Sequence, residues 1–176
     1  MELMEAIRIR KSYRKTFKPD PVPESDLKEI LEAATAAPSG CNTQTTRFIA
    51  VSDPQLAHKL GSIYNKPWAL TAPAAILLLS KETPSYHGNS YHLQDYSAAA
   101  QNVLLAVTDK GYGTAWIEGQ IEGEKAKQMG RLLGVPEDLS VVIYMPLGVP
   151  AEEVSTVLKM PLEERAWLNG YGKSFQ

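Results

Sequence analysis

A short basic run near the start of the chain, residues 10–15, combines cationic side chains with a hydroxyl. The groups able to grip an anion within it are Arg10, Lys11, Ser12 and Arg14. Guanidinium, ammonium and hydroxyl groups placed this close together can hold a phosphate through charge-assisted hydrogen bonds. A run of charges can equally be a solvated face of the protein. The run alone therefore predicts either an anion site or an exposed basic surface.

A second polar cluster lies where a predicted helix ends. The stretch APSGCNTQ, residues 37–44, stands between the amphipathic segment ESDLKEILEAATA and the apolar run FIAV. Proline stops a helix because it has no N–H donor, and amide side chains both donate and accept hydrogen bonds. So many hydrogen-bonding groups beside a core helix indicate more than a plain connector. The candidate site residues in this cluster are Pro38, Ser39, Gly40, Asn42 and Gln44.

The other chemistry-bearing residues form no second catalytic set. The histidines at positions 58, 87 and 92 lack metal-ligand spacing, so we expect no metal site. The single cysteine, Cys41, cannot make an internal disulfide, and its place after a helix end disfavours a thiolate. Gly111-Tyr112-Gly113 lies between a predicted helix and a predicted strand, which is the reverse of a dinucleotide-binding fingerprint. No hydrolase triad can be assembled.

Hydrophobic periodicity places these groups on a mixed set of elements. Helices are predicted over residues 2–9, 24–36, 54–64, 92–110 and 124–133, and strands over 47–52, 74–80, 114–118 and 139–148. The polar stretch 81–91 is predicted to be a loop. Helices and strands mix without strict alternation, which favours an α+β fold in one domain, residues 1–176. Asp95 and Asp109, on the mostly buried helix 92–110, are expected to face outward.

Length and charge limit the class of protein. A chain of 176 residues suits one buried core, and a formal net charge of −2 does not favour nucleic acid or an anionic membrane as a partner. The N-terminal segment interleaves charges with apolar residues, unlike a signal peptide. The longest apolar run, APAAILLL, is far below the roughly 18 residues of a membrane helix. These features predict a soluble, cytoplasmic protein.

Large apolar side chains continue into the C-terminal tail, about residues 160–176. The tail contains Trp167, Leu168, Tyr171 and Phe175, whereas free tails are usually polar. Such residues are expected to dock, either on the core of their own chain or on a second copy. The sequence does not choose between the two.

Four stretches share the ordered pattern of one known family. They are RIRKSYRKTFKPDPVPESDLKEILEAATAAPSGCNTQTTRFIAV, DYSAAAQNVLLAVTDKGYGTAWIEG, VPEDLSVVIYMPLGVP and LKMPLEE. On these stretches the chain resembles the nitroreductase family of flavoproteins along nearly its whole length. The resemblance implies a mostly antiparallel central sheet flanked by helices, and a homodimer with FMN bound non-covalently in the cleft between the subunits.

The resemblance also assigns roles to the two polar clusters. It implies that the phosphate and ribityl chain of FMN are held by Arg10, Lys11, Ser12 and Arg14 together with Lys159, which stands where the family often has arginine. The segment of residues 38–44 from one subunit would cover the flavin ring bound by the other. Thr45-Thr46 replaces a Pro-Trp pair common in the family, which leaves the identity of the acceptor open.

Further site residues follow from the same resemblance. Asn65 matches an asparagine that contacts the flavin, and Glu118-Gly119 matches a pair whose backbone N–H addresses flavin N5. Trp68 is a candidate wall of the substrate pocket. The loop 81–91, with Tyr86 and Tyr91, is a candidate lid that shapes the choice of acceptor.

The activity that the resemblance implies is hydride transfer from NAD(P)H through flavin N5 to an electron-poor small molecule, such as a nitroaromatic or a quinone, in a ping-pong cycle. Because the flavin performs the chemistry, no essential acid–base side chain is expected. One alternative is a flavoenzyme for a specific metabolite, by dehydrogenation, dehalogenation or flavin fragmentation. Others are a flavin-binding protein without turnover, and a structural dimer whose basic run is merely solvated.

Overall fold

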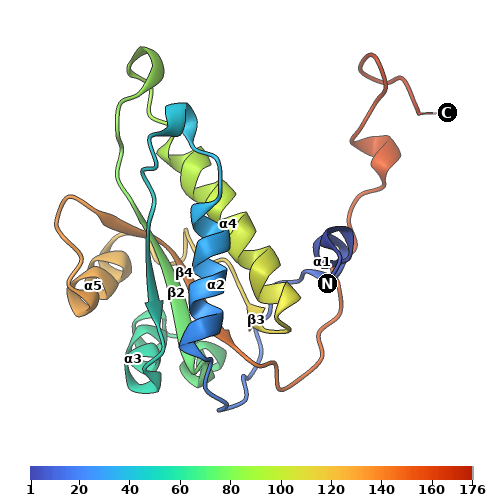
Figure 1. Ribbon diagram of the computed structural model, residues 1–176. Helices are drawn as coiled ribbons and strands as arrows, with labels where there is room; N and C mark the ends of the chain where they lie inside the picture. Colours follow the sequence, from blue (N-terminus) through green and yellow to red (C-terminus); the bar gives the residue numbers. More distant parts are fainter. Residues whose placement is uncertain (176) are drawn as a thin grey trace.

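A four-stranded antiparallel sheet forms the centre of the computed structural model, which describes residues 1–175. The strands are β1 (Arg47–Val51), β2 (Ala74–Ser80), β3 (Gly113–Thr114) and β4 (Ser140–Gly148), in the spatial order β1-β2-β4-β3. Every neighbouring pair is antiparallel. The predicted α+β class with a mostly antiparallel sheet is therefore confirmed (Figure 1).

Helices cover both faces of this sheet. The helices are α1 (Leu3–Ile9), α2 (Glu24–Thr35), α3 (Pro54–Tyr64), α4 (His92–Asp109) and α5 (Glu124–Leu133). One apolar cluster joins α2 and α4 to one face of β2 and β4, through residues such as Ile76 and Ile143. A second joins α3 and α5 to the other face, through Leu77 and Tyr144. All residues of β2 are buried, which explains why its sequence is continuously apolar instead of alternating.

One predicted strand was too long. Residues 114–118 were predicted to be a strand, but regular pairing is confined to Gly113–Thr114. The chain leaves the ladder and returns for one bridge, in which Ile117 and Tyr144 exchange N–H···O bonds of 3.2 and 2.9 Å. The apolar alternation persists, since Trp116 packs with the α2–α4 cluster and Ile117 with the α3–α5 cluster. Side-chain alternation alone does not reveal where ladder hydrogen bonds stop.

The start of α2 is fixed to the end of α4 by a small polar network. The Tyr112 hydroxyl donates to Asp26 Oδ2 at 2.6 Å, and Lys110 Nζ donates to Asp26 Oδ1 at 3.0 Å and to Glu29 Oε2 at 2.6 Å. The hydrogen bond from Tyr112, and after it that from Lys110, lower the pKa of the Asp26 carboxyl below its ordinary value. The two hydrogen bonds to Asp26 therefore contribute most to stability when its carboxyl is ionised.

Tyr112→Phe is expected to flatten the acid limb of the stability profile. A carboxyl with a lowered folded-state pKa adds stability above its unfolded pKa and loses it as the pH falls through the folded value. Without the Tyr112 hydroxyl the pKa of Asp26 moves back up, so the variant is less stable at neutral pH and loses less on acidification. Thermal unfolding at neutral pH and at about pH 3 measures this. Equal losses in wild type and variant would contradict it, and exposed Tyr86→Phe is the control.

The two ends of the chain expose apolar side chains. In α1, Leu3 and Met4 are 63% and 55% exposed, and in the tail Leu158 and Tyr171 are 95% and 88% exposed. Figure 1 shows the tail passing beside α1 and running away from the sheet. In the described residues the tail does not cover the core of its own chain, and its docking on a second copy stays a prediction. No helix of the described chain is both long and apolar enough to cross a bilayer.

Candidate functional site

A buried tyrosine positions the basic run. Tyr13 is 2% exposed, and its N–H donates to the carbonyl of Thr114 at 2.8 Å. Its hydroxyl donates to the carbonyl of Thr16 and accepts from the N–H groups of Ala151 and Glu152, at 3.0 and 3.2 Å. These bonds fasten the run to β3 and to the segment after β4. Sequence reasoning missed this role, although an aromatic residue inside a charged run was a visible signal.

The cations of the run face outward around this anchor. Lys11, Ser12 and Arg14 are exposed and Arg10 is half-buried. Lys11 Nζ donates to the carbonyl of Val154 at 2.7 Å, which ties the run to the segment leading into the tail. Lys159 follows on this segment and is exposed. The structure therefore brings the first cations and the stretch that carries Lys159 to one side of the molecule, and no bond in the described residues joins Lys159 to the run.

The polar loop 37–45 is held by Asp95. Its carboxylate accepts from the N–H of Gly40 and from Thr45 Oγ1, both at 2.8 Å. Thr43 Oγ1 lies 3.3 Å from the same carboxylate, and its shorter hydrogen bond, at 2.8 Å, goes to the Gly40 carbonyl. Asp95 is 4% exposed, so the expectation that it faces outward was wrong. Because it lies in the first turn of α4, its side chain reaches across to the loop instead of into solvent. For Asp109 the prediction of an outward-facing side chain is confirmed, because it is exposed and pairs with the N-terminal amine at 2.7 Å.

This loop has an unusual backbone. Cys41, Asn42 and Gln44 have φ values of 50°, 56° and 48°, in the left-handed region that costs energy for most residues other than glycine. The N–H of Gln44 donates to Ser39 Oγ at 3.0 Å, so part of the loop closes on itself. Asn42 and Gln44 are exposed, as is Pro38, whereas Ser39 and Gly40 are half-buried. The loop therefore presents amide groups outward on a tightly bonded base.

The two tyrosines of the loop 81–91 have different surroundings. Tyr91 precedes α4 and packs against Gly40, where an added Cβ would lie 2.7 Å from Tyr91 Cβ. Tyr86 lies in the short 3-10 helix Tyr86–Gly88, is 61% exposed and contacts the ring of His87, with 4.1 Å between centroids. Tyr91 thus supports the polar loop 37–45, whereas Tyr86 lies on the surface. A lid role for this loop stays a prediction.

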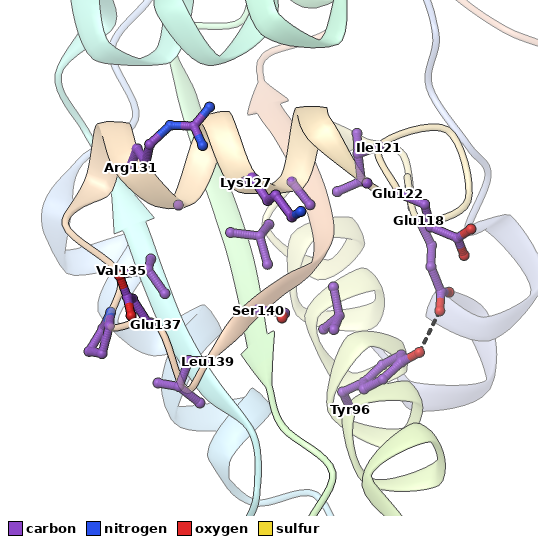
Figure 2. A pocket seen from close by; sticks show the side chains of 16 residues that line it. Tyr96, Glu118, Ile121, Glu122, Lys127, Arg131, Val135, Glu137, Leu139 and Ser140 are labelled. Atoms are coloured by element: carbon purple, nitrogen blue, oxygen red, sulfur yellow. Dashed lines mark hydrogen bonds between the residues drawn. The ribbon is translucent and has the colours of Figure 1, made fainter.

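The Glu118 carboxylate is fully engaged within the chain. It accepts from the Tyr96 hydroxyl at 2.5 Å (Figure 2). It also accepts from Trp116 Nε1 at 2.8 Å. Burial, and after it the hydrogen bond to Glu118, raise the pKa of Tyr96, so this hydroxyl keeps its proton. The side chain of Glu118 therefore acts as a clamp that fixes the end of the β3 segment against α4.

The backbone beyond this clamp carries unused donors. Within residues 1–175, the N–H groups of Glu118, Gly119 and Gln120 have no hydrogen-bond acceptor, while Ile121 N–H closes a turn onto the Glu118 carbonyl at 2.8 Å. An added Cβ at Gly119 would meet no atom within 4 Å, so open space lies beside this backbone. Consecutive unbonded N–H groups next to open space suit a ligand with acceptor atoms.

A basic cavity of about 550 Å³ lies beside these donors. The cavity brings together Arg14, a predicted FMN-binding residue, and Trp68, a predicted wall of the substrate pocket. Asn65 lies in the chain between two of the lining residues, Tyr64 and Lys66. Asn65 ends α3 with a left-handed φ of 63°, and its side chain is exposed. The lining residues are Arg14, Tyr64, Lys66, Trp68, Gln120 and Lys125. Sequence reasoning missed Lys66, Gln120 and Lys125, because single cations and amides at element ends carry no local signal.

A larger cavity, of about 630 Å³, lies below α5 (Figure 2). Its wall includes apolar side chains such as Ile121 and Leu139, and charged residues such as Lys127 and Arg131 stand along α5. Arg131 is engaged by Glu124 at 2.6 Å. Glu118 also lines this cavity, so the segment 118–125 contributes to both hollows.

Comparison with known proteins identifies the family of the chain. The model of the nitroreductase family matches residues 7–64 and 62–149. A protein of Archaeoglobus fulgidus named as an NADH dehydrogenase/NAD(P)H nitroreductase is 33% identical over 153 residues, which are 86% of this chain and 87% of the relative.

Solved structures give the same result for the fold. A structure from Bacteroides thetaiotaomicron, also named as an NADH dehydrogenase/NAD(P)H nitroreductase, has a TM-score of 0.82 and 26% identity to this chain. The match covers 96% of this chain and 98% of that one. An FMN-dependent nitroreductase from Clostridium difficile has a TM-score of 0.79 and 25% identity, with 96% and 99% covered. The chain therefore belongs to the nitroreductase family of oxidoreductases.

Proposed function

We propose that this protein is an FMN-dependent oxidoreductase that transfers hydride from NAD(P)H to an electron-poor small molecule, such as a nitroaromatic or a quinone, by a ping-pong mechanism. The observation that carries the proposal is the row of unbonded backbone N–H groups at residues 118–120, beside open space and a basic cavity. The names of the relatives, an NAD(P)H nitroreductase and an FMN-dependent nitroreductase, support the cofactors.

The donor set of the site fits a phosphorylated flavin. In this proposal the phosphate and ribityl chain are held by Arg10, Lys11, Ser12 and Arg14, with Lys159 added from the tail segment. A phosphate of charge near −2 in a partly buried site needs about two cations, and the exposed run supplies them. The backbone of the run is fixed by Tyr13, so binding an anion costs side-chain conformational entropy but little backbone entropy.

The flavin ring system carries hydrogen-bond acceptor atoms, so it requires N–H donors and not cations. The N–H of Gly119 faces no competing acceptor in the described chain, and it is assigned to flavin N5. The exposed amide of Asn65 is assigned to the polar edge of the ring. When bound, FMN supplies hydride transfer at N5, and the protein supplies a fixed N–H dipole there. No side-chain acid or base is assigned, and water provides the protons.

A second copy of the chain completes the site in this proposal. The outward amides of Asn42 and Gln44 stand on a bonded loop and would close over the flavin held by the partner subunit. The exposed apolar residues of α1 and of the tail provide the contact surface between copies. Monomeric proteins rarely leave so many large apolar side chains in solvent, which supports a homodimer.

Reconstitution with FMN tests the proposal directly. The purified protein, incubated with excess FMN and freed of unbound cofactor, is expected to be yellow and dimeric. NADH or NADPH should bleach the visible absorbance without oxygen, and a quinone added afterwards should restore it. A colourless monomer after reconstitution would contradict flavin binding. A yellow protein that neither nucleotide bleaches would instead identify a flavin-binding protein without turnover.

A further inference from the structure

The basic cavity has a one-sided composition. Three of its six lining residues are cationic, namely Arg14, Lys66 and Lys125, and within the described residues no carboxylate lines it. The whole chain contains 18 Lys and Arg against 20 Asp and Glu, so the positive charge of this cavity is a local feature and does not reflect the overall composition. Arg14 and Lys66 form no ion pair anywhere in residues 1–175, and their charge is therefore available to a ligand.

The polar groups of this cavity are almost entirely donors. The Tyr64 hydroxyl donates to Gln120 Oε1, which occupies the amide oxygen and leaves the amide N–H groups free. Lys125 Nζ donates to the Tyr64 carbonyl at 3.0 Å and lies 5.6 Å from the centre of the Tyr64 ring. An ammonium has three donors, so two are left. The cavity thus offers cations and N–H donors without matching acceptors.

The cavity is also well fixed in place. Tyr64 is 2% exposed, and its ring contacts those of Trp68 and Tyr144, with 5.8 and 5.9 Å between centroids. Lys125 is half-buried at the start of α5, and Lys66 directly precedes Pro67, the first residue of a short 3-10 helix. Cations on supported backbone lose less entropy on binding than those on a free loop. Aromatic walls with a donor-rich floor suit a small molecule that carries one anionic group.

We propose that Lys66 and Lys125 form an anion subsite next to the flavin, which takes the phosphate or carboxylate of the molecule that reacts there. This inference rests on the function proposed above. Lys66 follows Asn65 in the chain, and Lys125 shares the cavity with Gln120. Neither lysine is among the cations assigned to FMN, whereas Arg14, on the same cavity, is one of them and places the subsite beside the cofactor. Two molecules carry the required chemistry: NADPH, through its 2′-phosphate, and an acceptor with a carboxylate. NADH, the other possible electron donor, lacks the 2′-phosphate.

The experiment uses the FMN-loaded protein and the variants Lys66→Gln and Lys125→Gln. Lys59→Gln is the matched control, because Lys59 is an exposed residue of α3 outside this cavity and loses the same charge. The kcat/KM values for NADPH and NADH are measured with one neutral quinone. With NADH as donor, para-nitrobenzoate is then compared with para-nitrobenzyl alcohol. Titration of inorganic phosphate by calorimetry adds a readout that requires no turnover.

Each variant is expected to lower the preference for the member of one pair that carries the extra anionic group, the 2′-phosphate or the carboxylate, about tenfold, the size of one charge-assisted hydrogen bond. NADH oxidation and FMN affinity are expected to match the control, and an equal loss for NADH and NADPH, which share the diphosphate, would overturn the assignment to the 2′-phosphate. A fall in kcat/KM confined to NADPH identifies its 2′-phosphate as the ligand of the subsite. A fall confined to para-nitrobenzoate identifies the carboxylate of the electron acceptor. Phosphate affinity should fall in both variants. Ratios and phosphate affinities equal to those of Lys59→Gln would overturn the proposal. If the protein takes no FMN, the proposed function fails and phosphate titration of the flavin-free protein decides the subsite in the same way.

Discussion

Asp95→Ala is expected to lower the free energy of unfolding by about 3 kcal/mol, the order of one to two hydrogen bonds to a charged group, and to weaken FMN binding further. Asp95 is 4% exposed and accepts from the Gly40 N–H and from the Thr45 hydroxyl, both at 2.8 Å. Alanine would leave these donors without their partner. It would also release a loop whose positive φ values are kept only by surrounding bonds.

Two further variants separate this role from a general loss of charge. Asp95→Asn keeps an oxygen for the Gly40 N–H, and its amide can donate to rotated threonine hydroxyls, so a smaller loss is expected. Asp109→Asn removes the same charge from the other end of α4, where the carboxylate is exposed. Urea unfolding gives the stability, and flavin fluorescence gives FMN affinity. An Asp95→Ala protein as stable as Asp109→Asn would refute the anchoring role.

Removal of residues 157–176 is expected to convert the proposed dimer to a monomer and to abolish the proposed FMN retention. The deleted segment contains Val157, Leu158 and Tyr171, which are 73%, 95% and 88% exposed in the single chain. Burying a large apolar side chain contributes about 1.5–3 kcal/mol, so a few of these residues can hold two copies together. The cut leaves Val154 in place, because its carbonyl accepts from Lys11 and its side chain packs with Tyr13 and Phe17.

The tail also carries a cation, so its two roles must be separated. Lys159→Gln keeps the apolar residues and removes only the charge, and it should bind FMN more weakly while staying dimeric. Light scattering at several protein concentrations reports the assembly, and absorbance after gel filtration reports retained FMN. A truncated protein that elutes as a yellow dimer would show that the tail is dispensable. A full-length chain that is monomeric with FMN bound would refute the proposed packing of the tail on a second copy.

Local sequence pattern determined most of the secondary structure. The bounds of α3, β2 and α5 agree with the predicted ranges 54–64, 74–80 and 124–133. Apolar spacing and helix-ending residues such as Asn65 and Gly134 act within a few positions of one another, so they can be read directly. The strand at 114–118 was predicted too long because ladder hydrogen bonds depend on a partner strand that local spacing does not contain.

The sequence by itself determined which chemical groups are available. They are a basic run of the kind that can bind phosphate, an amide-rich loop after a helix, and apolar residues in the tail. Only the tertiary structure decided which of them meet. The antiparallel order of the sheet and the packing of α3 and α5 place Lys66 and Lys125 in one cavity with Arg14, and the first turn of α4 turns Asp95 inward to the loop 37–45. These contacts join residues distant in the chain, and their geometry depends on strand register and helix packing, which no short stretch of sequence specifies.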